Sequence, residues 1–231
     1  LQRTQVAPEA DAFTFAEIAG HEGVTPATED FADAEAEDVL ASLRAATNAM
    51  DEAEVTTGSR ILFITPTLKG ALDDFSLANP NRSKAVLTRF SRVVEVPQTR
   101  FYSAISLNSG ESEQFGYSRA EGSYVKTEDS SIVSGKTYYT ESSGTYTKVT
   151  SPAAGSLSSY YELVGAGAPI NFMVVERSAV IKFDKHVASR VFSPDELENL
   201  DSYMMKYRKY GIVELLDNKL DGVHVSCAPL A

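Results

Sequence analysis

Tryptophan is absent from this sequence, cysteine occurs once, and no apolar run is long. The single thiol, Cys227, excludes an internal disulfide and leaves no set of thiolates that could hold a metal. The longest apolar run, residues 169–175, is far shorter than the roughly 20 residues that a helix needs to cross a bilayer. We therefore predict neither a disulfide scaffold nor a membrane-spanning helix.

Cations are also scarce in the chain. Lys and Arg number 21 against 32 Asp and Glu, which gives a net charge of -11 at pH 7. Such a charge repels phosphate backbones unless the few cations gather on one face. The composition therefore argues against specific binding of nucleic acid.

The short motifs that mark common enzymes are missing as well. There is no HExxH zinc motif, no GxSxG nucleophile elbow, no phosphate-binding P-loop and no GxGxxG dinucleotide turn. His21, His186 and His224 are scattered, and none has a second ligand at helical spacing. In a strand, His224 and Cys227 would point to opposite faces and could not act as a base and a nucleophile. We predict no catalytic, cofactor-binding or metal-binding residue, and no enzymatic activity.

Two polar clusters near the C-terminus each have a functional and a structural interpretation. One could hold a hard cation, or it could be the acidic first turn of a helix: Asp195, Glu196, Glu198 and Asp201. The other could stack on bases and contact phosphates, or it could be a strand face in a subunit contact: Lys206, Arg208 and Lys209 with Tyr203, Tyr207 and Tyr210. The structural interpretation is favoured for both, because acids suit a helix start and the chain is negative overall.

What the sequence does contain is enough apolar material for one or two compact units. The 231 residues are 43% hydrophobic, with a mean hydropathy of -0.18. Residues 1–31 show no sustained period and predict an arm or loop with one short strand. Apolar residues at three- and four-residue intervals predict an amphipathic helix over 36–50. A buried strand over 60–64 then leads into a helix from Pro66 to about residue 75, with Thr65 as its N-cap.

The middle of the chain changes character. Turn formers gather at residues 79–82, and strands are expected within 93–105. Residues 118–163 are rich in Ser, Thr, Gly and Tyr, and β-formers at 137–140 and 145–149 flank a Gly-containing turn. This pattern predicts a hairpin in a small β-rich insert. The alternative is a flexible Ser-rich loop, which such a density of aromatics disfavours.

The last third resumes the buried-strand pattern at residues 170–175. One helical turn over 176–180 and a short strand over 181–183 are expected next. Ser193-Pro194-Asp195-Glu196 has the N-cap, first-turn proline and capping-box Glu of a helix start. Residues 207–216 and 223–227 predict two long strands, joined by the turn 217–222 into a C-terminal β-hairpin.

Several phrases in this order resemble the major capsid proteins of tailed bacteriophages with the Hong Kong 97-type fold. They are Gly58-Ser59-Arg60-Ile61-Leu62-Phe63-Ile64-Thr65-Pro66, Thr99-Arg100-Phe101-Tyr102, Ile170-Asn171-Phe172-Met173-Val174-Val175, Ser178-Ala179-Val180, Lys185-His186, Phe192-Ser193-Pro194-Asp195, Tyr207-Arg208-Lys209-Tyr210-Gly211 and Asp217-Asn218-Lys219. The phrases consist of ordinary core residues, so the resemblance depends on their order.

The resemblance implies an α+β capsid-like body, with P and A domains formed by residues 1–115 and 164–231 and a β-rich module inserted at 116–163. It implies a structural protein that self-assembles into the icosahedral shell around phage DNA, without a cofactor. The expected partners are other copies of the chain in pentamers and hexamers, with scaffolding or decoration proteins as further candidates. The expected location is the virion, after assembly in the cytoplasm of the bacterial host.

The sequence also departs from that family. Its N-terminal arm, extended loop and long spine helix are not recognisable, and the chain begins at Leu1 without an initiator Met, so we expect residues to be missing upstream. Two alternatives stay open. One is a phage tail or cell-surface adhesin that binds through the Tyr-rich module, and the other is a hydrolase whose carboxylates converge only in the folded chain.

Overall fold

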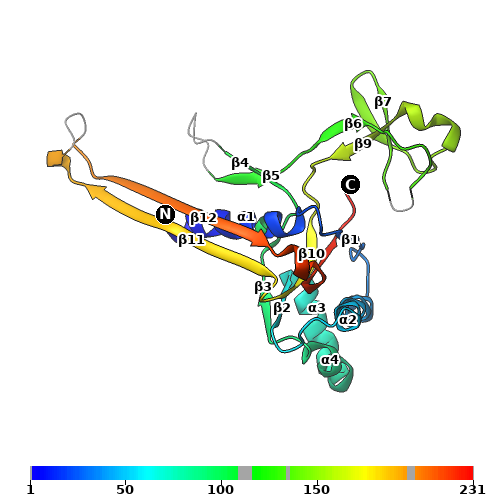
Figure 1. The fold of residues 1–231 in the computed structure, drawn as a ribbon, viewed down its shortest axis with the longest axis horizontal. Helices are drawn as coiled ribbons and strands as arrows, with labels where there is room; N and C mark the ends of the chain where they lie inside the picture. The colour runs from blue at the N-terminus through cyan, green and yellow to red at the C-terminus, as the bar shows by residue number, and fades with distance from the viewer. Residues whose placement is uncertain (1, 109–115, 134–135, 197–200, 231) are drawn as a thin grey trace.

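The computed structural model describes residues 2–108, 116–133, 136–196 and 201–230. It mixes helices and strands in three parts: a body around a five-stranded sheet, a long two-stranded ribbon, and a small second sheet (Figure 1). The ribbon and the small sheet project from the body in different directions (Figure 1). The α+β class expected from the sequence is confirmed.

The five-stranded sheet has the order β1-β13-β10-β2-β3. Its strands are β1 (Ala27–Thr28), β2 (Arg60–Ile64), β3 (Arg92–Glu95), β10 (Ile170–Glu176) and β13 (Val223–Cys227). β10 is antiparallel to both β2 and β13, whereas β3 runs parallel to β2 and β1 parallel to β13. All seven residues of β10 are buried, and five of them are apolar. The two polar ones, Asn171 and Glu176, both form side-chain hydrogen bonds.

Three helices cover one face of this sheet: α2 (Ala36–Glu52), α3 (Pro66–Ala78) and α4 (Pro80–Leu87). The predicted helix over 36–50 and the strand-helix unit from residue 60 are confirmed. Reciprocal bonds between Glu35 and Asp38 cap the start of α2, and Pro66 occupies the first turn of α3. The expected turn at residues 79–82 is wrong, because Pro80 begins α4 directly after Asn79.

The opposite face is covered by α1 (Ala7–Ala19), which follows a short π-helix, η1 (Gln2–Val6). The arm or loop predicted for residues 1–31 is therefore wrong for residues 2–19, whereas residues 20–31 are a loop with the short strand β1, as expected. Pro8 lies in the first turn, where its missing N–H costs nothing, so it does not break the helix. Phe15 anchors α1 to the body, with ring centroids 5.2 Å from Phe63 and 4.9 Å from Phe101.

The ribbon pairs β11 (Val180–Phe192) with β12 (Met204–Leu215) in one antiparallel ladder. The C-terminal hairpin predicted between 207–216 and 223–227 is wrong, because β12 pairs with β11 and β13 pairs with β10. The 3-10 helix η6 (Asp217–Gly222) connects the two sheets. Residues 177–179 form a turn, and the short strand expected at 181–183 is the beginning of β11.

The helix expected from Ser193 can be followed through its first turn only. A single 3-10 turn, η5 (Pro194–Glu196), follows β11, and Glu196 accepts a hydrogen bond from the Ser193 backbone N–H. Residues 197–200 lie outside the described part of the chain. The predicted capping contact between Glu196 and Ser193 is therefore present, and one helical turn lies within the described residues.

The second sheet is reached through η2 (Gln98–Arg100) and the pair β4 (Ile105–Leu107) and β5 (Tyr117–Arg119). Its order is β6-β9-β7-β8, formed by β6 (Ser123–Lys126), β7 (Tyr139–Ser142), β8 (Thr145–Lys148) and β9 (Tyr160–Val164), with η4 (Ala154–Ser159) before β9. The predicted hairpin is confirmed as β7–β8, with positive φ at Ser143 and Gly144 in its turn. Tyr138, Leu157 and Tyr160 form a core separate from that of the body.

Candidate functional site

The ribbon of β11 and β12 is the most unusual surface of the molecule. Twelve residue pairs join the two strands, with a β-bulge between Asp184 and His186. Among the described residues, no third strand extends this sheet. A two-stranded sheet is marginally stable alone in water, so a ribbon of this length is normally supported by a second layer.

Apolar side chains are exposed on both faces of the ribbon. On one face Phe183 lies directly opposite Ile212, and these residues are 59% and 55% exposed. On the other face Val191 lies opposite Met205, and these residues are 59% and 46% exposed. The full exposed set, here called the apolar ribbon surface, is Ile181, Phe183, Val187, Val191, Met205, Tyr210 and Ile212. Contiguous apolar pairs of this kind mark interaction sites, whereas single exposed apolar residues are normal.

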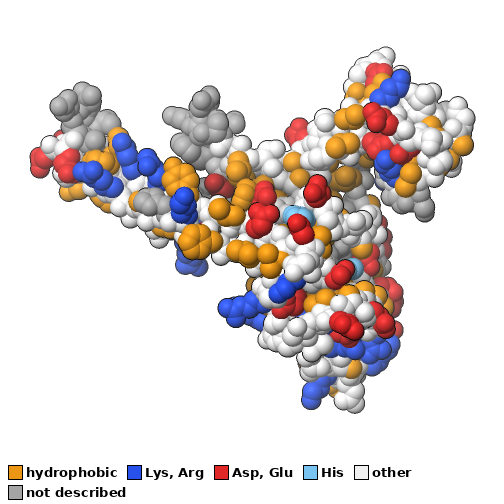
Figure 2. All heavy atoms as spheres, in the orientation of Figure 1, with side chains coloured by type: hydrophobic (Ala, Val, Ile, Leu, Met, Phe, Trp, Pro, Cys, Tyr) orange, Lys and Arg blue, Asp and Glu red, His pale blue; other side chains and the backbone are white. Residues whose placement is uncertain are grey.

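The ribbon is also basic, although the chain is acidic. Its two strands contain six Lys and Arg residues against Asp184 and Glu214, which is a net charge of +4. The rest of the chain then has fifteen cations against thirty acids. Lys and Arg side chains lie along the ribbon among exposed apolar groups (Figure 2).

The cluster of cations and tyrosines predicted near residues 203–210 is divided by this geometry. Successive residues of a strand point to opposite faces, so Lys206 and Arg208 lie on one side of β12 and Tyr207 and Lys209 on the other. Lys209 forms an ion pair with Asp184, with 3.2 Å between Nζ and Oδ1. These residues therefore belong to two different surfaces.

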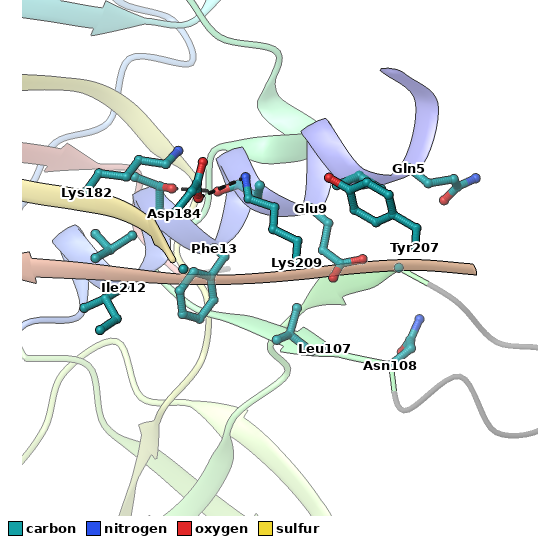
Figure 3. A pocket seen from close by; sticks show the side chains of 16 residues that line it. Gln5, Glu9, Phe13, Leu107, Asn108, Lys182, Asp184, Tyr207, Lys209 and Ile212 are labelled. Atoms are coloured by element: carbon teal, nitrogen blue, oxygen red, sulfur yellow. Dashed lines mark hydrogen bonds and ion pairs between the residues drawn. The ribbon is translucent and has the colours of Figure 1, made fainter. Parts of the chain in front are cut away.

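A groove lies where the base of the ribbon meets α1 and β4. It has a volume of about 850 Å³. Phe13 of α1, Leu107 of β4 and Ile212 of β12 line it, together with charged side chains such as Glu9 and Lys182 (Figure 3). Apart from Ile212, the groove's residues on β12 include Tyr207, Lys209 and Val213, which lie on the same face of that strand as Met205. The groove therefore adjoins the ribbon face that carries Val191 and Met205.

The remaining residues singled out from the sequence do not converge on one site. His224 packs on the Phe172 ring at 6.0 Å, and burial lowers its pKa while Glu29 opposes the shift. Cys227 is buried in the core cluster on the other face of the sheet, and burial raises its pKa to about 12. The prediction that these two side chains point to opposite faces is confirmed.

The other candidates are equally separate. Asp195 and Glu196 lie in the turn at the ribbon tip, Glu198 is outside the described residues, and His186 has its backbone in β11. His21 follows α1, and its Nδ1 accepts a hydrogen bond from the Gly23 backbone N–H. Within the described ranges, no three His, Cys, Asp or Glu residues are placed to hold a metal ion.

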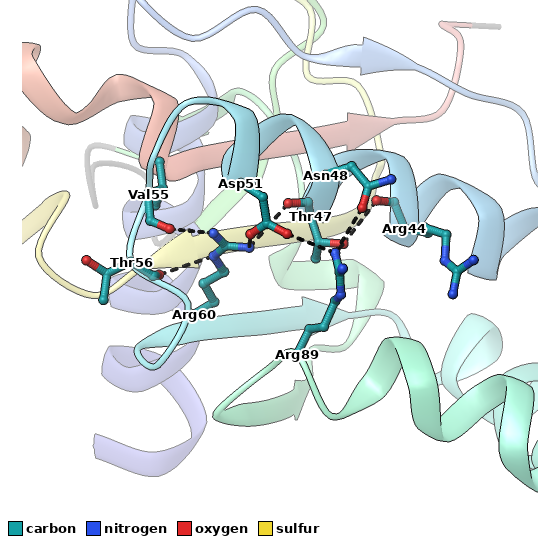
Figure 4. Close-up of polar contacts among 8 residues, drawn as sticks. All are labelled: Arg44, Thr47, Asn48, Asp51, Val55, Thr56, Arg60 and Arg89. Atoms are coloured by element: carbon teal, nitrogen blue, oxygen red, sulfur yellow. Dashed lines mark hydrogen bonds and ion pairs between the residues drawn. The ribbon is translucent and has the colours of Figure 1, made fainter.

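One buried charge escaped the sequence analysis, which treated Arg60 as part of an apolar strand. Its side chain is 1% exposed, and Nη1 lies 2.7 Å from Asp51 Oδ1. The guanidinium also donates to the backbone carbonyls of Thr47, Val55 and Thr56 (Figure 4). These contacts tie the end of α2 to β2, so the role of Arg60 is structural.

No helix within the described ranges combines the length and apolar character needed to cross a membrane. No protein-family model matches the chain, and no curated protein is similar to it at a significant level.

Proposed function

We propose that this chain is a shell-forming structural subunit, the major capsid protein of a tailed phage with the Hong Kong 97-type fold. The observation that carries the proposal is the apolar ribbon surface, which is exposed on both faces of a single-layer sheet. Neighbouring subunits in a shell would supply the missing layers. The ordered sequence phrases that resemble this family give the proposal its specific form.

The energetics favour many weak contacts over one strong contact. Full burial of a large apolar side chain stabilises by about 1.5–3 kcal/mol, and each of the seven ribbon side chains is about half exposed. Covering all seven would therefore contribute roughly 7 kcal/mol, whereas association itself costs about 4–15 kcal/mol. A single ribbon contact would be weak, but symmetry repeats it around a closed assembly.

The total surface supports the same proposal. The chain exposes 14244 Å² at a mass of 25.0 kDa. A compact monomer of that mass exposes about 10,200 Å². The difference, roughly 4,000 Å², exceeds the surface of about 800 Å² that one partner buries in a standard interface. The chain therefore has surface for several neighbours.

The proposal is tested by making the ribbon polar. Phe183→Ser with Ile212→Ser removes one cross-strand apolar pair, and Leu77→Ser on α3 is the matched control, because Leu77 is 85% exposed outside the ribbon. Mass photometry over a range of concentrations should show assemblies for the parent and the control, and loss of assembly for the ribbon variant. Equal thermal melts of the body would show that folding is retained. Unchanged assembly in the ribbon variant would refute the proposal.

A second candidate function, binding through the residues 123–164 module, is favoured by the module's own core and its projection from the body (Figure 1). The module also has an ion-pair network of its own. Lys136 Nζ lies 2.8 Å from Asp129 Oδ2 and 2.7 Å from Glu162 Oε2, and these bonds raise the Lys136 pKa to about 12. A glycan-binding screen tests this function, and specific binding that survives loss of assembly would favour an adhesin over a capsid subunit.

A further inference from the structure

The distal half of the ribbon has a pair of cations that no acid among the described residues neutralises. Arg190 on β11 lies directly opposite Lys206 on β12, and Arg208 is on the same face of β12. We call these three side chains the basic stem. Like charges directly opposite each other destabilise a sheet. Within the described ranges no acid lies within ion-pair distance of Arg190 or Lys206, and both cations instead lie over the Phe192 ring, at 4.6 and 5.1 Å.

The opposite charge is concentrated between β1 and α2. Residues 29–38 contain six acids and no cation: Glu29, Asp30, Asp33, Glu35, Glu37 and Asp38. All of them except Glu29 are exposed. We call the segment the acidic flank. Glu37 already pairs with Arg82, and Glu35 and Asp38 cap α2, but Asp30 and Asp33 add negative charge at the surface.

The two surfaces cannot meet within one chain. The ribbon extends from one side of the body, whereas β1 and α2 lie on the other side (Figure 1). Pairing them therefore needs a second molecule. Each molecule would contact one neighbour through its basic stem and another neighbour through its acidic flank. Such head-to-tail contacts generate rings when the rotation closes.

We propose that the basic stem of one copy docks against the acidic flank of a second copy. This inference rests on the proposed function and names the partner surface for the ribbon. A second copy fits better than nucleic acid, because the chain outside the ribbon is strongly negative and would repel a phosphate backbone. The contact orients subunits, while the apolar ribbon surface supplies most of the attraction.

The experiment is a charge swap measured as the concentration needed for assembly. The stem variant is Arg190→Glu with Lys206→Glu, and the flank variant is Asp30→Lys with Asp33→Lys. Each alone should raise that concentration at least tenfold, because it places like charges in contact. The combination of all four changes should restore assembly to within about threefold of the parent. Asp74→Lys with Glu121→Lys is the control for a change of two acids elsewhere on the surface.

The outcomes separate this inference from the proposed function. Restored assembly in the combined variant supports the pairing. A second supporting result is that, at 1 M salt, where charges are screened, the stem variant and the flank variant assemble at the same concentration as the parent. If the stem variant and the flank variant each lose assembly and the combination of all four changes does not restore it, the pairing is wrong. If the charge variants assemble normally while Phe183→Ser with Ile212→Ser does not, the proposed function stands and this inference falls. If the stem variant fails only in the presence of DNA, the stem binds nucleic acid, which also overturns the inference.

Discussion

Replacing Arg60 with Ala should destabilise the body far more than losing an exposed arginine. The guanidinium is held by Asp51 and by three backbone carbonyls, and its side chain is almost fully buried. Truncation leaves the three carbonyls without this donor and opens a cavity between α2 and β2, whereas Asp51 keeps its ion pair with Arg89. Leaving a buried polar group without its hydrogen-bond partner costs about 1–3 kcal/mol, and three carbonyls lose this donor, so a loss of about 3 kcal/mol or more is expected. That is a large part of the 5–15 kcal/mol by which typical domains are stable.

Arg82→Ala is the matched control. Arg82 forms a comparable ion pair with Glu37, with 2.9 Å between Nη1 and Oε1, but the two side chains are 64% and 49% exposed. Exposed pairs contribute about 0–1 kcal/mol, so Arg82→Ala should cost about 1 kcal/mol or less. Urea unfolding followed by circular dichroism measures both variants. Equal losses for the two, or a loss below about 1 kcal/mol for Arg60→Ala, would refute this account of the buried network.

Two further predictions concern single ionisable groups. Burial disfavours the charged form of Glu176, but hydrogen bonds from Ser178 and Ser59 together outweigh it and lower its pKa. The ionised Glu176 should therefore stabilise the fold fully above about pH 4.3, the pKa of a free Glu side chain, and this stabilisation should be lost as the pH falls through the lower pKa of the folded state. Because Glu176→Gln removes this pH-dependent contribution, the free energy of unfolding of the variant should differ less between pH 7 and pH 3 than that of the parent. Equal differences in parent and variant would contradict this. Cys227 is 4% exposed and its pKa is raised, so iodoacetamide at pH 8 should alkylate it only after unfolding. Mass spectrometry measures the labelling. Rapid labelling of the native protein would show that Cys227 is not buried.

The elements that the sequence predicted well carry strong local signals. The apolar period of α2, the mainly apolar sequence of β10 and the Gly-containing turn of β7–β8 each specify their structure within a few residues. The failure at α1 has a local cause too. Its buried face uses small residues such as Ala12 and Ala16 beside Phe15, and this pattern is too weak to reveal an amphipathic helix.

Strand pairing was harder to predict, because the apolar pattern of a strand does not name its partner. β12 and β13 follow each other with a short connection, which favours a hairpin, yet they enter different sheets. The exposure of the apolar ribbon surface could not be predicted either, because the apolar pattern of a strand does not show what covers it. Val187 and Val191 on β11 lie four residues apart on one face of the strand, as they would in any half-buried strand. Only the fold shows that no described part of the chain covers them.

If many copies of this chain build a closed shell, the protein expressed as its gene encodes it should form that shell. Negative-stain electron microscopy, combined with mass photometry, detects such particles directly. Uniform closed particles, or pentamers and hexamers, are expected, and they should be lost when Phe183 and Ile212 are both changed to Ser. A protein that stays monomeric at every concentration and salt condition would show that the chain is not a shell subunit.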